Sequence, residues 1–162
     1  MSEPSWLTLA RRYRGVAEIP GKATAPVISR WLRSLKAWWS DDETPWCGVF
    51  VAAVMQEAGY ERPKHWYRAK AWGAYGSQLV GPEVGAIVVY DRKGGGHVGF
   101  VTAVDVNGRI FTLGGNQGNR VSVVPFDKDR VIGFRWPPGA PPPHHTLPVI
   151  AAAHIKSSNN EA

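Results

Sequence analysis

The apolar residues of this chain repeat with a helical period up to about residue 58 and with a strand period after residue 84, so the pattern changes once. Three helices are predicted, at residues 5–14, 25–38 and 45–58. Five strands are predicted, at residues 87–90, 98–104, 109–113, 121–124 and 131–136. Helices that precede strands, with short connections between the strands, predict an α+β domain in which N-terminal helices pack on an antiparallel sheet of about five strands.

Composition limits the class of protein further. The 162 residues suit one domain, and 44% hydrophobic with 20% charged residues exclude a wholly disordered chain. The single cysteine excludes an intramolecular disulfide and a cysteine-cluster zinc site, and no apolar run approaches the roughly 18–20 residues of a membrane span. The net charge of +6 favours a polyanionic partner such as nucleic acid, anionic lipid or an acidic wall polymer, but charge alone does not choose among them.

The last part of the chain differs in composition from the rest. Six of the 13 prolines fall within the last 26 residues, and three of them are consecutive at positions 141–143. This distribution predicts a catalytic domain over residues 1–138 and a Pro-rich linker with a polar tail over residues 139–162. Residues 147–155 are modestly apolar and could form a docking helix. The Pro-rich and polar composition favours the other interpretation, so we expect the tail to be dispensable for folding.

Cys47 is a candidate nucleophile. Thr44 suits the N-cap and Pro45 the first position of the helix predicted at residues 45–58, which places Cys47 in its first turn. The helix dipole and the unpaired amides of that turn favour a thiolate. Taken alone, the cysteine is equally consistent with a buried core residue.

His97 is a candidate base. It follows three consecutive glycines and opens the strand predicted at residues 98–104, where an imidazole can reach a cleft. A surface histidine without a catalytic role would have the same sequence context. The assignment of His97 as a base therefore depends on a second residue that holds its imidazole.

Asn116 is the candidate partner of His97. If Asn107-Gly108 forms a two-residue hairpin turn, Gly99 lies opposite Asn116, and Asn116 becomes a diagonal neighbour of His97 within side-chain reach. An amide oxygen at that place could accept the imidazole N–H and fix the orientation of the ring. A Cys–His–Asn set is one known solution for thiol acyl transfer.

Three blocks of the sequence together resemble those of the CHAP/NlpC-P60 cysteine peptidases and amidases. They are Thr44-Pro45-Trp46-Cys47, Gly96-His97-Val98-Gly99-Phe100-Val101 and Gly114-Gly115-Asn116-Gln117. With Asp41-Asp42-Glu43 in front of the first block, the pattern resembles more narrowly a subgroup found in phage lysis genes and related bacterial proteins. The resemblance covers roughly residues 4–136.

The resemblance implies a papain-like α+β fold and hydrolysis of an amide bond in peptidoglycan. It implies that Cys47 is the nucleophile, His97 the base and Asn116 the group that orients the imidazole; we further expect Trp46 and Gln117 to line the substrate groove. The sequence departs from the family twice. Ala86 follows Gly85 where many members have Asp, and the orienting residue is often acidic in the broader family.

The acidic run Asp41, Asp42 and Glu43 has two interpretations. It supplies favourable negative charge ahead of a helix N-terminus, or it forms a calcium site, as in some CHAP endolysins. Its spacing is not that of an EF-hand loop, so capping is favoured and we expect no metal and no other cofactor.

The sequence therefore predicts a phage endolysin-like peptidoglycan hydrolase, a monomer that binds bacterial peptidoglycan, with no nucleic-acid partner and no stable membrane insertion. The alternatives are a bacterial amidase toxin with the same chemistry and a non-catalytic wall-binding module. The first four residues, Met1-Ser2-Glu3-Pro4, lack a secretory signal. We accordingly expect synthesis in the bacterial host cytoplasm and action at the cell wall or periplasm. Sugar–peptide amidase and endopeptidase action need the same residues, so the bond that is cleaved stays open.

Overall fold

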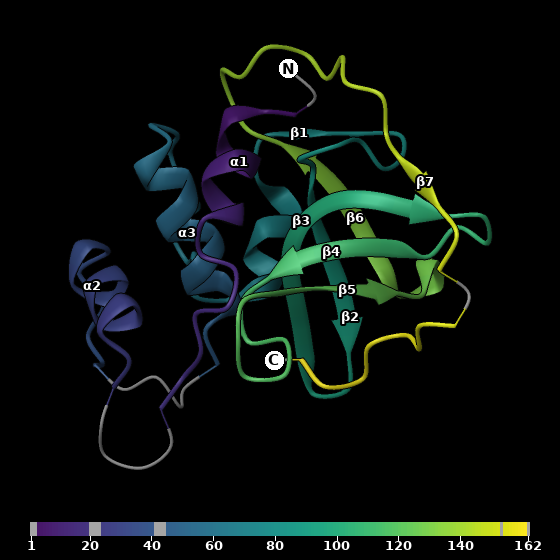
Figure 1. Cartoon of the computed structure of the whole chain (residues 1–162). Helices are drawn as coiled ribbons and strands as arrows, with labels where there is room; N and C mark the ends of the chain where they lie inside the picture. The colour runs from purple at the N-terminus through teal and green to yellow at the C-terminus, as the bar shows by residue number, and fades with distance from the viewer. Residues whose placement is uncertain (1–2, 20–23, 41–44, 153, 162) are drawn as a thin grey trace.

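Helices precede the sheet along the chain, and the predicted α+β class is confirmed (Figure 1). The computed structural model describes residues 3–19, 24–40, 45–152 and 154–161. The helices are α1 (Ser5–Arg11), α2 (Pro26–Ser34) and α3 (Cys47–Glu57), with short 3-10 helices η1 (Ala69–Ala74) and η2 (Lys128–Arg130). The strands are β1 (Ser77–Gln78), β2 (Ile87–Arg92), β3 (Gly95–Asp105), β4 (Ile110–Gly114), β5 (Ser122–Phe126), β6 (Val131–Trp136) and β7 (Val149–Ile150).

The sheet contains the five predicted strands and two more. Its order is β1-β6-β2-β3-β4-β5, and these neighbours are all antiparallel. The two further strands, β1 and β7, are each two residues long, too short to show an alternating pattern in the sequence. Strand β7 pairs with the end of β3 in parallel, which makes the sheet mixed at this one place.

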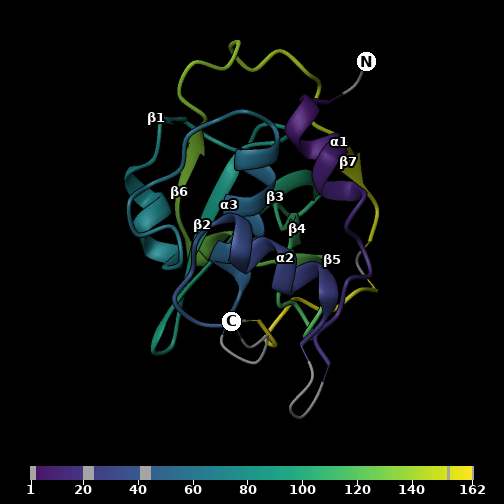
Figure 2. The ribbon, with the colours of Figure 1, turned by 90° about the vertical axis from the view of Figure 1, so that its left-hand side faces the viewer.

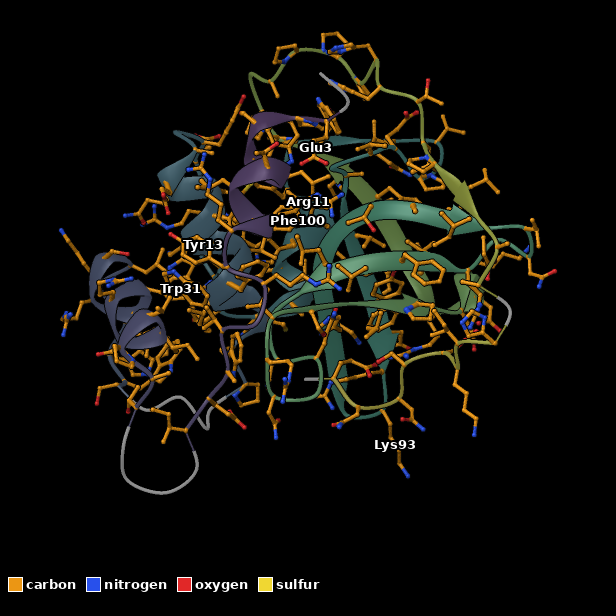
Figure 3. The ribbon with its side chains drawn as sticks, viewed as in Figure 1. Glu3, Arg11, Tyr13, Trp31, Lys93 and Phe100 are labelled. Atoms are coloured by element: carbon orange, nitrogen blue, oxygen red, sulfur yellow. The ribbon has the colours of Figure 1, made fainter. Side chains whose placement is uncertain are left out.

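Helix α3 lies between the sheet and α2 (Figure 2). Phe50 of α3 contacts Phe100 of β3 on its inner side, with ring centroids 6.0 Å apart. On its outer side Phe50 contacts Trp31 of α2 at 5.6 Å, and Trp31 in turn meets Tyr13 edge to face at 5.2 Å (Figure 3). Because α3 is covered on both sides, nine of its 11 residues are buried, and its nearly continuous apolar sequence is explained by this position.

The two ends of α3 differ in how well they were predicted. Gly59 follows the helix with φ +90°, and Tyr60 donates back to Met55 O at 2.8 Å, so the predicted glycine stop is confirmed. At the other end the prediction is wrong by two residues. The helix begins at Cys47 with Trp46 as N-cap, Pro45 precedes it, and Thr44 lies outside the described residues.

The hairpin between β3 and β4 is longer than predicted. Gly108 N–H donates to Asp105 O at 3.0 Å, Asp105 N–H donates to Arg109 O at 3.1 Å, and Gly108 adopts φ +83°. Three residues, 106–108, therefore connect the strands in place of the two that Asn107-Gly108 suggested. The Arg109 side chain hydrogen-bonds the Asp105 carboxylate and holds the pKa of that carboxyl below its usual range.

Residues 139–152 and 154–161 follow the surface of the domain instead of leading away from it. Trp136 Nε1 donates to Pro141 O at 2.8 Å, Val149 of β7 pairs with Val104, and Ala152 is buried. The Arg109 guanidinium donates to Ala152 O at 2.8 Å. The tail is thus held through backbone groups, which its polar and Pro-rich composition does not reveal. Within the described part of the chain, no helix is long and apolar enough to cross a membrane.

Candidate active site

The start of α3 presents Cys47 as the first helical residue. Its side chain is buried, with 4% of its surface exposed. The first intrahelical bond runs from Phe50 N–H to Trp46 O at 3.0 Å, so the amides of Cys47, Gly48 and Val49 have no acceptor within the helix. A thiol in this position has backbone N–H donors beside it, which are the groups that stabilise an oxyanion in acyl transfer.

His97 lies near the beginning of β3, directly opposite Tyr90 of β2. It is fully buried, and its ring stacks on Phe126 at 5.2 Å with an interplanar angle of 13°. Tyr90 stacks on the same Phe126 ring at 4.2 Å. Burial raises the pKa of Tyr90 above its ordinary value, so its hydroxyl stays protonated, and it lies 2.7 Å from Thr112 Oγ1. These aromatic contacts fix the plane of the imidazole.

Gln117 is the residue that contacts His97 within the loop after β4. Its Oε1 lies 2.9 Å from His97 Nε2, and the Gln117 side chain is only 3% exposed. The Gln117 amide nitrogen donates to Thr112 O at 3.1 Å and to Ser122 O at 2.8 Å. Because two carbonyls occupy this nitrogen, the amide cannot turn around, and the oxygen must face the imidazole.

This fixed amide determines the tautomer of neutral His97. An amide oxygen only accepts, so Nε2 must carry the proton that it donates to Gln117. The lone pair of the neutral imidazole is then on Nδ1. A base held in one tautomer and one ring plane meets the geometric requirement for repeated proton transfer.

Gly114 and Gly115 connect the imidazole to the nucleophile helix. A Cβ on Gly114 would lie 3.2 Å from His97 Nε2, and a Cβ on Gly115 would lie 2.9 Å from the Trp46 ring. Adjacent Cα atoms are about 3.8 Å apart. The start of α3 and the His97–Gln117 pair therefore lie against two consecutive residues, the last of β4 and the first of the loop that follows it. The structure thus brings together residues from all three blocks of the sequence pattern.

The close approach at Gly115 gives a stability prediction. A Cβ on Gly115 would lie 2.7 Å from Phe50 Cβ and 2.9 Å from two Trp46 ring carbons, contacts that force α3 and β4 apart. We expect Gly115→Ala to lower the free energy of unfolding by about 1–3 kcal/mol. The matched control is Gly133→Ala, because no atom lies within 4 Å of the Cβ that it would add. Equal melting temperatures for the two variants would contradict the close packing at Gly115.

The predicted strand register, which placed Asn116 opposite Gly99 and diagonal to His97, is wrong. The three-residue hairpin moves the pairing by one residue, and a bulge at Thr102 moves it by another, so Phe100 pairs with Leu113. The ladder then ends at Gly114, and Asn116 adopts a left-handed conformation with φ +59°. Asn116 is buried in the turn that carries Gln117 to the imidazole. A catalytic role for Asn116 stays a prediction, while the observed contact with His97 belongs to its neighbour.

The two residues expected to line the substrate groove are both buried. Trp46 is 1% exposed, and its indole N–H donates to Glu18 Oε2 at 3.2 Å. Gln117 uses its whole amide in the contacts described above. Contact of Trp46 or Gln117 with a substrate therefore stays a prediction, and in this structure both support their neighbours. The sequence showed that Gln117 has an amide oxygen able to accept a hydrogen bond from His97. Whether this oxygen comes close enough to the imidazole depends on the turn at Asn116.

The acidic residues that were considered as calcium ligands cannot be compared with the structure. Asp41, Asp42 and Glu43 all lie outside the described residues. Among residues 3–19, 24–40, 45–152 and 154–161, no three His, Cys, Asp or Glu side chains come together as metal ligands.

A thiol at a helix N-terminus, an imidazole on a strand of the sheet and an amide that fixes the imidazole tautomer are also the elements of a papain-like cysteine hydrolase site. The comparison with family models agrees, because residues 39–116 match the CHAP domain. This match covers just under half of the chain and supports membership of the CHAP/NlpC-P60 superfamily. A CHAP domain suggests, in general terms, peptidoglycan hydrolase or amidase activity. The searches of curated proteins and of solved structures found no match.

Proposed function

We propose that this protein is a phage endolysin-like peptidoglycan hydrolase that cleaves an amide bond through a thioester intermediate. The observation that carries the proposal is the hydrogen bond between His97 Nε2 and Gln117 Oε1, next to Gly114, whose neighbour Gly115 packs against Trp46 and Phe50 at the start of α3. Burying an imidazole costs free energy of desolvation. An imidazole held in one tautomer near the helix that begins at Cys47 suits general acid–base catalysis.

In the proposed reaction, the Cys47 thiol first passes its proton to His97 Nδ1, and the resulting thiolate attacks the carbonyl carbon of the amide. Backbone amides of the first turn of α3 stabilise the negative oxygen of the tetrahedral intermediate. His97 gives the proton on Nδ1 to the leaving nitrogen, the C–N bond breaks, and the acyl group remains on sulfur as a thioester. Water then attacks the thioester while His97 Nδ1 takes its proton, which releases the carboxylic acid and restores the thiolate.

The basic charge of the chain supports an anionic polymer as substrate. The net charge is +6, and a positively charged protein is drawn to a negatively charged wall before specific contacts form. This attraction weakens with salt, so we expect binding to wall fragments to fall as ionic strength rises.

The test of the function is a digest of purified peptidoglycan followed by mass analysis of the products. We expect new amino and carboxyl termini in equal numbers and no new reducing sugar ends, because an amide bond is cut. A free lactyl carboxyl on the glycan would identify sugar–peptide amidase action, and new termini within the peptides would identify endopeptidase action. Intact peptidoglycan across several wall types, or glycosidic cleavage, would contradict the proposal.

A further inference from the structure

The end of the chain lies against the loop that holds the base. This loop, residues 115–121, connects β4 to β5, and the last described residues of the chain lie beside it (Figure 1). Gly118 N–H donates to Asn160 O at 2.9 Å, and Gln117 and Glu161 form an isolated antiparallel bridge. The backbone of Gln117, whose side chain fixes His97, is therefore held directly by residues 160 and 161.

The Glu161 side chain makes a second connection toward His97. Its carboxylate is 3% exposed and forms an ion pair with Arg130. Ser158 Oγ donates to the other carboxylate oxygen at 3.1 Å. The Arg130 guanidinium lies 5.3 Å from the centre of the Phe126 ring, on which His97 stacks.

Glu161 is therefore linked to both supports of the imidazole. Its backbone meets Gln117, which bonds Nε2 of His97, and its carboxylate holds Arg130, which contacts the ring that sets the imidazole plane. Burying a carboxylate and a guanidinium costs free energy of desolvation. Such pairs are well suited to fixing one arrangement of neighbouring elements.

We propose that Glu161 is a positioning residue for His97, so that the C-terminal tail is part of the catalytic machinery. The role in turnover rests on the proposed hydrolase function, whereas the role in fixing the imidazole does not. The segment predicted from composition to be a dispensable tail then has a specific task. It holds the loop at residues 115–121 in the conformation that directs the Gln117 oxygen to Nε2.

The experiment compares Glu161→Ala with Ser157→Ala in the full chain. Ser157 Oγ donates to Asp127 Oδ1 at 2.6 Å, so its variant also removes an anchor of the tail, but that anchor does not lie on the loop or on Arg130. The first readout is the ¹⁵N spectrum of the imidazole groups, with His97 assigned through His97→Gln. The second is the separation of kcat from KM on solubilised peptidoglycan.

In wild type and Ser157→Ala, we expect the ¹⁵N shifts of a single tautomer protonated at Nε2. In Glu161→Ala we expect shifts averaged between the two tautomers and a kcat lower by roughly 10-fold to 100-fold, with KM nearly unchanged. If Glu161→Ala does not fold, Glu161→Gln and Glu161→Asp replace it. Glu161→Asp should restore more of the wild-type spectrum than Glu161→Gln, because it keeps the charge that pairs with Arg130.

A wild-type spectrum and kcat in Glu161→Ala would overturn the proposal, as would equal changes in Ser157→Ala. The spectrum does not depend on turnover. An inactive wild type with the expected spectral difference would therefore refute the hydrolase function and leave the positioning role of Glu161 supported.

Discussion

Cys47→Ser should abolish hydrolysis of peptidoglycan, with a loss of about 10⁴-fold or more, while the protein stays folded. A hydroxyl is far less ionised than a thiol at neutral pH, so the serine cannot replace the thiolate. The two side chains are nearly equal in size, and a serine at the first turn of α3 can bond to the amides there that have no acceptor within the helix. We expect the free energy of unfolding to change by no more than about 1 kcal/mol. The measurements are the initial rate of wall lysis and the melting temperature.

The chain contains one cysteine, which makes an independent control possible. Alkylation of the wild-type protein should add a single group, at Cys47, and should remove activity in proportion to the labelled fraction. Activity that persists in Cys47→Ser would contradict the assignment of the nucleophile. Wall binding without hydrolysis, unchanged by alkylation, would favour the non-catalytic wall-binding module.

Gln117→Ala should lower kcat by roughly 100-fold, because the imidazole loses the acceptor that fixes its tautomer. The same change leaves the carbonyls of Thr112 and Ser122 without the amide that binds them. An unsatisfied buried carbonyl costs about 1–3 kcal/mol, so the melting temperature should also fall. The pH dependence of the rate, measured with the ¹⁵N spectrum of His97, separates the catalytic loss from the loss of stability.

Asn116→Ala is the matched comparison, since the two residues are adjacent and both buried. We expect it to reduce kcat less than Gln117→Ala does and to leave His97 protonated at Nε2. The opposite order of effects would mean that Asn116 orients the base, as the strand register predicted from the sequence implied.

Helices and long strands could be predicted because each carries its own hydrophobic period. The apolar residues of α3 and the nearly continuous apolar runs of β2 and β3 reflect burial that a single segment reveals. The candidate residues Cys47 and His97 could be named for the same reason, since a helix start and a strand start are local features. The CHAP match over residues 39–116 confirms the resemblance that these blocks suggested.

What the sequence could not determine were the relations between segments. The partner of His97 depended on the three-residue turn that ends at Gly108 and on a bulge at Thr102. Each of the two shifts the strand pairing by one residue, and such a shift cannot be recognised from the composition of the strands. Whether Asn116 or Gln117 faces the imidazole was decided by the left-handed turn at Asn116. The tail joins the domain through backbone hydrogen bonds and the pairing of Glu161 with Arg130. Backbone groups are the same at every residue, so only the tertiary structure could show that the end of the chain lies beside the base.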